Sequence, residues 1–266
     1  MTLLQRWIAG LAALCLAGAV HAGRACNAQP PSAQTVVRGL TLAERTLQAL
    51  NAEHARAGTQ MVVLARAGQD LRAHGLHSSH LGWAYRTQEG NWRVVHKLNH
   101  CGTATAALYR QGLGEFFLDD LWRHEAAWAV PTPEVQARLL PLLRDNARVV
   151  ALHEARYNLV SYPWSVKYQQ SNQWAIETLA LAMEPGLTRR EQAQAWLRLK
   201  AYEPTTLRLG PFTRLGARAS AANVAFDDHP NSQRFADRIE TVTVDSVFAW
   251  LPRAGLGAAP VRLALP

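Results

Sequence analysis

Residues 77–98 read His77-Ser78-Ser79-His80-Leu81-Gly82-Trp83-Ala84-Tyr85-Arg86, Thr87-Gln88-Glu89-Gly90-Asn91 and Trp92-Arg93-Val94-Val95-His96-Lys97-Leu98. Two runs rich in aromatic and β-branched residues flank a short polar segment that contains a glycine, which predicts a β-hairpin. Side chains alternate between the faces of a strand, so His80 and Gly82 share one face. A glycine inside a strand often marks the close approach of another backbone or a ligand. We therefore expect a group to pack tightly over His80.

Helical and extended patterns lie on both sides of this hairpin. A capping box of Thr41 and Glu44 predicts a helix that ends at Gly58, and residues 60–65 are typical of a strand. Residues 103–114, 115–128, 132–143 and 147–156 have helical patterns, and Ser171 to Met183 is a strong helix followed by Pro185-Gly186. Thr188 and Glu191 predict another helix start, and residues 238–250 alternate as in a strand. This order favours the α+β class, with a small antiparallel sheet or half-barrel packed against helices.

The N-terminus has the features of a secretory signal peptide. Arg6 precedes an apolar run, and Val20-His21-Ala22 is a small-residue cleavage site, so residues 1–22 are predicted to be removed. Residues 23–252 are then expected to form a single domain, and residues 253–266 a flexible tail. These features predict a periplasmic or secreted protein with no transmembrane segment after removal of the signal.

The chain of 266 residues has a formal net charge of +8, carried almost entirely by arginine, since lysine occurs only at positions 97, 167 and 200. Such a charge in a cytosolic protein would suggest nucleic-acid binding. The predicted export argues against a nucleic-acid partner, so we expect attraction to an anionic envelope polymer or to lipid head groups instead. No pattern indicates a cofactor or an oligomeric state.

Two cysteines remain after the predicted cleavage, Cys26 and Cys101. An even number of cysteines in an oxidising compartment predicts a disulfide bond. For a closed loop of roughly 75 residues, the chain-entropy estimate of its stabilisation is about 4 kcal/mol. The alternative is that Cys101 is a reactive thiolate near His80, His96 or His100.

The helix that starts at Ser171 offers a candidate nucleophile. The first turn of a helix has unpaired backbone N–H groups that favour negative charge, which would stabilise a developing oxyanion. The alternative interpretation is that Ser171 only caps the helix, a contribution of about 1 kcal/mol.

The ordered set of His80-Leu81-Gly82, Val94-Val95-His96, Tyr157-Asn158 and Ser171-Asn172-Gln173 resembles the NlpC-type, papain-like peptidase superfamily. Because the histidine strands precede the nucleophile helix, the likeness is to the circularly permuted branch, which includes lecithin–retinol acyltransferase-like proteins and bacterial lipid-amide hydrolases. The resemblance implies that His80 is the general base, His96 the residue that orients it and Ser171 the nucleophile. The Ser171-Asn172-Gln173-Trp174 run also resembles a secreted bacterial family of unknown function.

The chain departs from the papain-like pattern because Ser171 stands where those families have cysteine. A serine hydroxyl is not stored as an anion, so a neutral His80 would have to remove its proton during the attack. Two hypotheses follow: an amide or ester hydrolase or acyltransferase that uses Ser171 and His80, and a catalytically inactive binding or scaffold protein with the same cleft.

Other residues are weaker candidates. Tyr168, from an aromatic run in residues 157–168, and Asn172 are predicted to bind substrate, although ordinary packing also explains the aromatic run. His74, His77 and His80 would lie on different faces of a strand, and His124-Glu125 lacks the second histidine of a zinc-protease helix, so no metal site is predicted. Asp227-Asp228-His229 either borders a cleft or forms a solvated loop.

Overall fold

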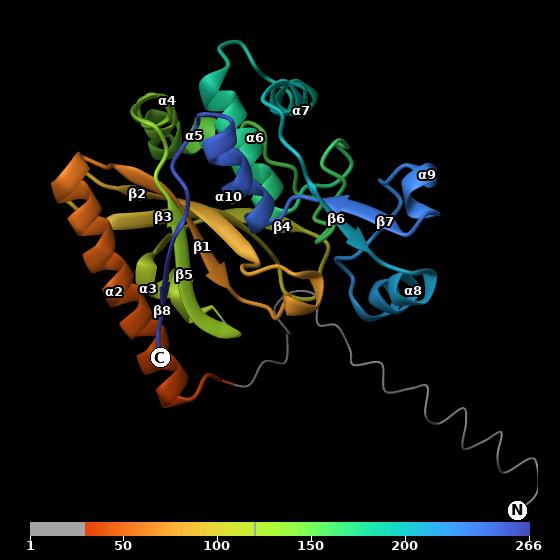
Figure 1. Cartoon of the computed structure of the whole chain (residues 1–266), viewed down its shortest axis with the longest axis horizontal. Helices are drawn as coiled ribbons and strands as arrows, with labels where there is room; N and C mark the ends of the chain where they lie inside the picture. The colour runs from red at the N-terminus through yellow and green to blue at the C-terminus, as the bar shows by residue number, and fades with distance from the viewer. Residues whose placement is uncertain (1–29, 120) are drawn as a thin grey trace, which may run out of the picture.

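The protein is built around a six-stranded sheet in the order β4-β3-β2-β1-β5-β8, in which every pair of neighbours is antiparallel (Figure 1). The structure is a computed structural model and describes residues 30–119 and 121–266. The strands are β1 (Met61–Ala67), β2 (His80–Arg86), β3 (Trp92–Asn99), β4 (Ala106–Gly112), β5 (Arg123–Ala129) and β8 (Val261–Ala264). The sheet stays open, and helices pack against it, which confirms the predicted α+β class.

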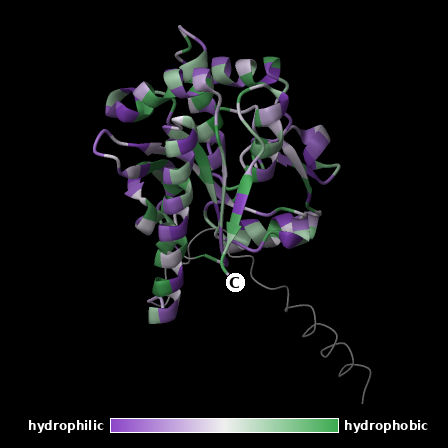
Figure 2. Ribbon diagram, turned by 60° about the vertical axis from the view of Figure 1, so that its left-hand side comes forward, coloured by the Kyte–Doolittle hydropathy of each residue, from purple (hydrophilic) through white to green (hydrophobic). Residues whose placement is uncertain are grey.

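Helices cover both faces of the sheet. One face packs against α2 (Ala33–Ala57) and α3 (Leu113–Leu118). The other face shares an apolar cluster with four further helices, which are α4 (Pro133–Arg144), α6 (Ser171–Met183), α7 (Arg190–Leu199) and α10 (Val244–Arg253). In Figure 2, hydrophobic and hydrophilic residues alternate around the helices, as expected where one side of each helix is buried.

The central strand β1 contributes apolar side chains to both faces of the sheet. Met61, Val63 and Ala65 join the cluster on the α6 side, whereas Val62 and Leu64 join the cluster on the α2 side. All seven residues of β1 are buried. Because successive side chains of a strand point to opposite faces, a strand covered on both sides is a continuous apolar run rather than an alternating one.

A smaller unit lies beside the sheet. It consists of a two-stranded antiparallel ribbon of β6 (Thr205–Arg208) and β7 (Arg238–Thr241), with α8 (Pro211–Ser220) between them in the sequence (Figure 1). Val224, Phe226 and Ile239 form its apolar cluster. The short segments η2 (Arg72–His74), α5 (Asn146–Val149) and α9 (Asn231–Arg234) complete the secondary structure of the described residues.

A buried polar cluster holds α6 against α7. Arg190 donates two hydrogen bonds to the fully buried Glu177 carboxylate, at 2.7 and 3.0 Å. Gln169, Gln173 and Gln194 donate three further hydrogen bonds to the same carboxylate. A buried charge costs little only when it is paired and hydrogen-bonded, so this cluster fixes the mutual position of the two helices.

The first helix is longer than predicted. It begins after Ser32, whose side chain accepts a hydrogen bond from the Thr35 N–H, rather than at Thr41. Thr41 lies inside the helix and donates its hydroxyl to the Val37 carbonyl at 2.8 Å. The predicted end is confirmed, since Gly58 has the left-handed conformation (φ 68°) that closes a helix.

The region from residue 103 to residue 128 was predicted to be helical, which is wrong for most of it. It forms β4, the short helix α3 and β5. β4 pairs with β3 along its whole length, from Arg93 opposite Gly112 to Asn99 opposite Ala106. Here the pairing with neighbouring strands outweighs the local helix propensity.

Three further predictions also differ from the structure. Residues 147–156 contain only the end of α5, and the strand predicted for residues 238–250 stops at Thr241. Thr243 then accepts a hydrogen bond from the Ser246 N–H and starts α10. Residues 253–266, expected to be flexible, contain β8, which pairs with β5.

Two predicted helices are confirmed. α4 begins with Pro133 in its first turn and continues through Pro141, and α6 spans the predicted Ser171 to Met183. The predicted signal peptide, residues 1–22, lies outside the described residues. Within the part of the chain that the structure describes, no helix has the length and apolarity needed to cross a membrane.

Candidate functional site

The sheet splits open at one end between β2 and β3. The two strands pair from Arg86 opposite Trp92 to Trp83 opposite Val95, and no further. β2 nevertheless stays paired with β1, and β3 with β4. Residues 80–82 and 96–99 therefore line the two sides of a wedge within one sheet. A cavity of about 710 Å³ lies at this split.

Gly82 is the residue that permits the crowding of side chains beside the split. A Cβ at this position would lie 2.8 Å from the His96 Cβ and 2.8 Å from the Val94 Cγ1. The close neighbour predicted from this glycine is thus the adjacent strand β3. Any larger residue would push against His96, so Gly82 lets the two histidines meet.

His80 and His96 form a hydrogen-bonded pair with a defined direction. His80 Nε2 lies 2.8 Å from His96 Nδ1, and His96 Nε2 lies 2.8 Å from Gln111 Oε1. The Gln111 oxygen only accepts, so His96 Nε2 carries a proton and its Nδ1 is an acceptor. His80 then donates from Nε2, which leaves the lone pair of its Nδ1 available as a base.

Both imidazoles are held in the neutral form. Burial keeps the pKa of His80 well below 6.5, and the nearby Arg66 charge and His96 lower it further. Burial and Arg66 lower the pKa of His96 to about 3, although its hydrogen bond with Gln111 acts in the opposite direction. A neutral imidazole at pH 7 is the state that a general base requires.

Arg66 is a member of the site that the sequence prediction missed. It lies opposite His80 in the pairing of β1 with β2, it is buried, and it lines the cavity. It donates hydrogen bonds to the Phe116 carbonyl and to Asp119. An arginine in the middle of a buried strand is unusual enough to be a sequence signal for such a position.

Ser171 lies at the first position of α6, next to the helix cap. The cap is Gln170, whose side chain accepts a hydrogen bond from the Asn172 N–H. The interpretation of Ser171 as a simple cap is therefore wrong. Ser171 lines the cavity, and its Oγ lies 3.5 Å from the hydroxyl of the buried Tyr157.

Asn172 attaches α6 to the split. Its Oδ1 accepts from the Leu81 N–H at 3.1 Å, and its Nδ2 donates to the carbonyls of Ser79 at 3.4 Å and Val242 at 3.2 Å. Asn172 also lines the cavity, as expected for a substrate-binding residue. Its amide is already bonded to the backbone, however, and these bonds hold the start of α6 beside residues 79–81.

His80 and Ser171 line the same cavity from different sides of the sheet. His80 packs near Phe116 on the α3 side, with ring centroids 6.0 Å apart, whereas its neighbour Leu81 is buried in the cluster on the α6 side. The split between β2 and β3 is what gives both residues access to one space. Among the hydrogen bonds of the described residues, none joins His80 directly to Ser171.

Lys97 is a second residue that the sequence prediction missed. It follows His96 on β3, so its side chain points to the opposite face, where its Nζ donates to the Glu154 carbonyl at 2.6 Å and to Gln169 Oε1 at 2.8 Å. Burial lowers the pKa of Lys97 to about 7, with Arg190 acting in the same direction. A lysine on the buried face of a strand is the signal by which it could have been found.

The far end of the cavity is apolar. Its walls come from the ribbon and from the loops that pack on it, with Leu159, Val160, Leu207, Leu209, Val224 and Phe226 as the apolar lining. Tyr168 does not line this cavity, contrary to the prediction; its ring lies 5.4 Å from Lys167 Nζ, outside the site. Tyr157, from the same aromatic run, is the tyrosine that reaches Ser171.

The other candidates are resolved only in part. Cys101 lines the cavity, but Cys26 lies outside the described residues, so their disulfide stays a prediction. Asp228 and His229 are not solvated: they pair at 3.0 Å with both side chains buried. Within residues 30–119 and 121–266, no three histidine, cysteine or acidic residues are grouped so that they could hold a metal ion.

Comparison with known proteins places this site within a described family. The family model "Uncharacterized protein conserved in bacteria (DUF2145)" matches residues 53–251, a range that includes His80, His96 and Ser171. No curated protein and no solved structure matches the chain.

Proposed function

The chain belongs to the DUF2145 family of bacterial proteins, and from the geometry of its cavity we propose that it is an acyl-transfer enzyme, in which Ser171 is the nucleophile and His80 the general base. One observation carries this proposal. The hydrogen bonds from Gln111 through His96 to His80 leave a neutral imidazole with an acceptor nitrogen in the wall of a cavity that Ser171 also lines. An orienting partner behind the base is the arrangement on which activated nucleophiles depend.

The proposed reaction proceeds in two steps. Ser171 Oγ attacks the carbonyl carbon of an amide or ester, while His80 Nδ1 takes the hydroxyl proton, directly or through one water. The Ser171 N–H, in the first turn of α6, donates to the developing oxyanion. The bond to the leaving amine or alcohol then breaks, and His80 returns the proton to it. Water hydrolyses the resulting acyl-serine with His80 again as the base, or a second acceptor takes the acyl group.

The lining of the cavity favours a substrate with an apolar acyl group. His80 and Ser171 occupy the polar end, while the leucines and Phe226 of the ribbon unit occupy the other. A cavity of about 710 Å³ is in the range typical of small-molecule sites, which combine an apolar wall with a few polar groups. The step needs no cofactor.

We also propose that the chain is related to the permuted papain-like superfamily and that it is located in the cell envelope. A strand that carries the base, a neighbouring strand that carries its orienting residue, and a later helix that starts with the nucleophile are the supporting features. The proposed export and the Cys26–Cys101 disulfide are tested by intact mass of the secreted protein after thiol blocking, with and without reductant. Two freely alkylated cysteines would contradict the disulfide.

A second candidate function is a binding protein that keeps the cleft without turnover. It is motivated by the contact of Ser171 Oγ with the Tyr157 hydroxyl at 3.5 Å, in place of a hydrogen bond to His80. On this hypothesis Ser171→Ala would leave the function of the protein in cells intact.

Labelling with a fluorophosphonate probe distinguishes the two. The acyl-transfer proposal predicts one probe per molecule by intact mass, located on Ser171, and none in the Ser171→Ala variant. Ser78→Ala is the matched control, because Ser78 is a buried serine that lines the same cavity. Labelling that persists in Ser171→Ala would remove Ser171 from the mechanism.

A further inference from the structure

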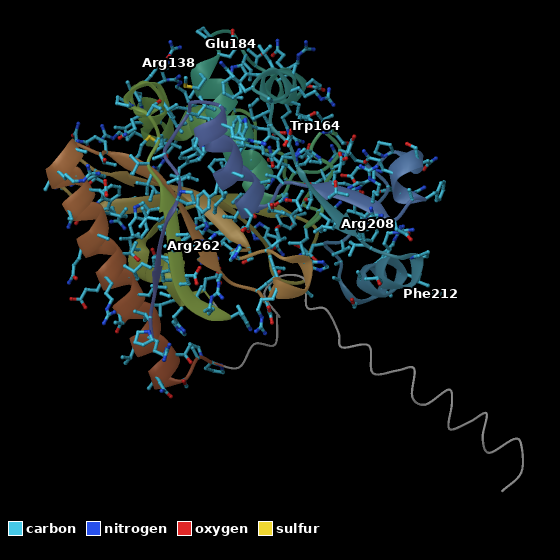
Figure 3. The ribbon with its side chains drawn as sticks, viewed as in Figure 1. Arg138, Trp164, Glu184, Arg208, Phe212 and Arg262 are labelled. Carbon is cyan, nitrogen blue, oxygen red and sulfur yellow. The ribbon has the colours of Figure 1, made fainter. Side chains whose placement is uncertain are left out.

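The helix α8 is unusual among the longer helices because none of its residues is buried. Most of the stability of a helix in a protein comes from an apolar face packed against the rest of the fold. α8 instead presents apolar side chains to solvent: Phe212 is 88% exposed and Leu215 67% exposed. Figure 3 shows Phe212 on the outer side of α8, at the edge of the molecule.

The two sides of α8 have different surroundings. Phe212, Leu215 and Ala219 follow the spacing of one helix face and form an outward apolar stripe. Thr213 and Ala217 lie on the opposite face and line the cavity. One short helix therefore separates the apolar end of the cavity from solvent while its outer surface stays uncovered.

Positive charge surrounds this stripe. Residues 204–226 contain no aspartate or glutamate. Arg208 and Arg238 are paired directly across β6 and β7 at the end of the ribbon where α8 begins, although like charges in this position are unfavourable. Arg218 lies on α8 itself. All three arginines are exposed and form no salt bridge with a described residue, whereas Arg214 is paired with Asp237 at 2.6 Å.

We propose that these residues form a docking surface for an anionic lipid bilayer, which we define as Phe212 and Leu215 together with Arg208, Arg218 and Arg238. An interfacial helix lies in the plane of the membrane with its apolar residues among the acyl chains and its basic residues among the head groups. The exposed apolar stripe matches the acyl-chain region, and the arginines without a salt bridge match the head-group region. Docking would hold the α8 side of the cavity next to the bilayer. This docking surface is independent of the chemistry proposed for Ser171.

The test is co-sedimentation of the full-length mature protein with vesicles. Vesicles of phosphatidylglycerol and phosphatidylcholine should bind the protein, and vesicles of phosphatidylcholine alone should bind it far more weakly. Because one arginine near an anionic surface contributes about 1 kcal/mol, Arg208→Gln with Arg238→Gln should weaken binding roughly 25-fold. Phe212→Ser with Leu215→Ser should weaken it by about tenfold or more, as expected for two inserted apolar side chains.

Two variants outside the surface serve as controls. Leu199→Ser removes an apolar side chain of α7 that is 80% exposed, and Arg148→Gln removes an exposed arginine elsewhere. Both should bind like the wild type. The four surface substitutions should not lower the Tm, because no buried residue is altered.

Three results would overturn the proposal. The first is absence of binding to the anionic vesicles, and the second is equal binding to both kinds of vesicle. The third is binding that requires the arginines but survives the loss of Phe212 and Leu215, which would assign the surface to a soluble anionic polymer instead of a bilayer.

Discussion

Gly82 and His96 are so close across the split that a Cβ on residue 82 would lie 2.8 Å from the Cβ of His96. Neighbouring strands of a sheet normally accommodate side chains at such positions. Here the space is taken by the histidine that orients His80. The contact between the two imidazoles therefore depends on the absence of a side chain at Gly82.

Substitution of Gly82 by alanine should destabilise the protein. The added methyl group would meet His96, Val94 and the Val95 carbonyl at 2.8–3.0 Å, and overpacking of this kind costs about 1–3 kcal/mol. Urea unfolding measures the change in the free energy of unfolding. Gly216→Ala is the matched control: nothing lies within 4 Å of its Cβ position and it is inside α8, so it should stabilise the protein by about 0.5–1 kcal/mol. Equal effects of the two substitutions would contradict the close contact at Gly82.

The buried pair of Glu177 and Arg190 should behave as a strongly coupled unit. Arg190→Met leaves a fully buried carboxylate without its cation and should cost about 3–5 kcal/mol. The double variant with Glu177→Gln should be less destabilised than the sum of the two single variants, which urea unfolding of all four proteins can measure. The exposed pair of Glu203 and Arg253 is the control and should give a coupling energy below about 1 kcal/mol. Additivity at Glu177 and Arg190 would show that the pair is not buried together.

Stability should fall in mild acid because of the buried histidines. An unfolded imidazole takes up a proton below about pH 6.5, whereas the pKa of folded His96 is lowered to about 3 by burial and by Arg66. Between these values the unfolded chain binds more protons, so the free energy of unfolding decreases as the pH falls, by about 1.4 kcal/mol per pH unit for each such histidine. Above about pH 6.5 the histidines are neutral in both the folded and the unfolded state, so their full contribution to the free energy of unfolding is present.

The contribution of His96 is isolated by comparing slopes of unfolding free energy against pH. His96→Gln should have a shallower slope than the wild type between about pH 6 and pH 4. His74→Gln, a substitution at an exposed histidine, is the matched control variant. If His96→Gln and the wild type had the same slope, the neutral buried pair would be refuted.

The direction of the hydrogen-bond chain can be observed by long-range ¹H–¹⁵N NMR of the histidine side chains. The contact of His96 Nε2 with Gln111 Oε1 predicts that both His96 and His80 carry their proton on Nε2. Gln111→Leu should remove this fixed tautomer of His96. A protonated Nδ1 on His80 in the wild type would leave it without the acceptor that the proposed attack requires.

The sequence was sufficient to predict the elements on which the candidate site is built. The hairpin of β2 and β3 has a clear turn between β-branched and aromatic runs, and α6 has an apolar stripe and a proline-glycine end, so local patterns fix both. The shared face of His80 and Gly82 follows from strand alternation. Each of these signals is contained within about 20 residues of sequence.

The features that were not predicted depend on pairing between distant segments. β4 and β5 became strands because they pair with β3 and β1, and β8 because it pairs with β5. The split between β2 and β3 requires knowledge of where their register ends, and the cavity requires the ribbon unit, more than a hundred residues away in the chain. Tyr168 was chosen from composition alone, while the fold brings Tyr157 to Ser171.

The most direct test of the central claim is the rate of fluorophosphonate labelling at Ser171 as a function of pH. Because burial keeps the pKa of His80 well below 6.5, the account predicts that the wild type reacts as fast at about pH 5.5 as at about pH 7.5, and that His80→Gln reacts at least about a hundredfold more slowly at both. Equal rates for His80→Gln and the wild type, or a wild-type rate that declines with a midpoint near pH 6.5, would contradict a buried neutral His80 as the base for Ser171.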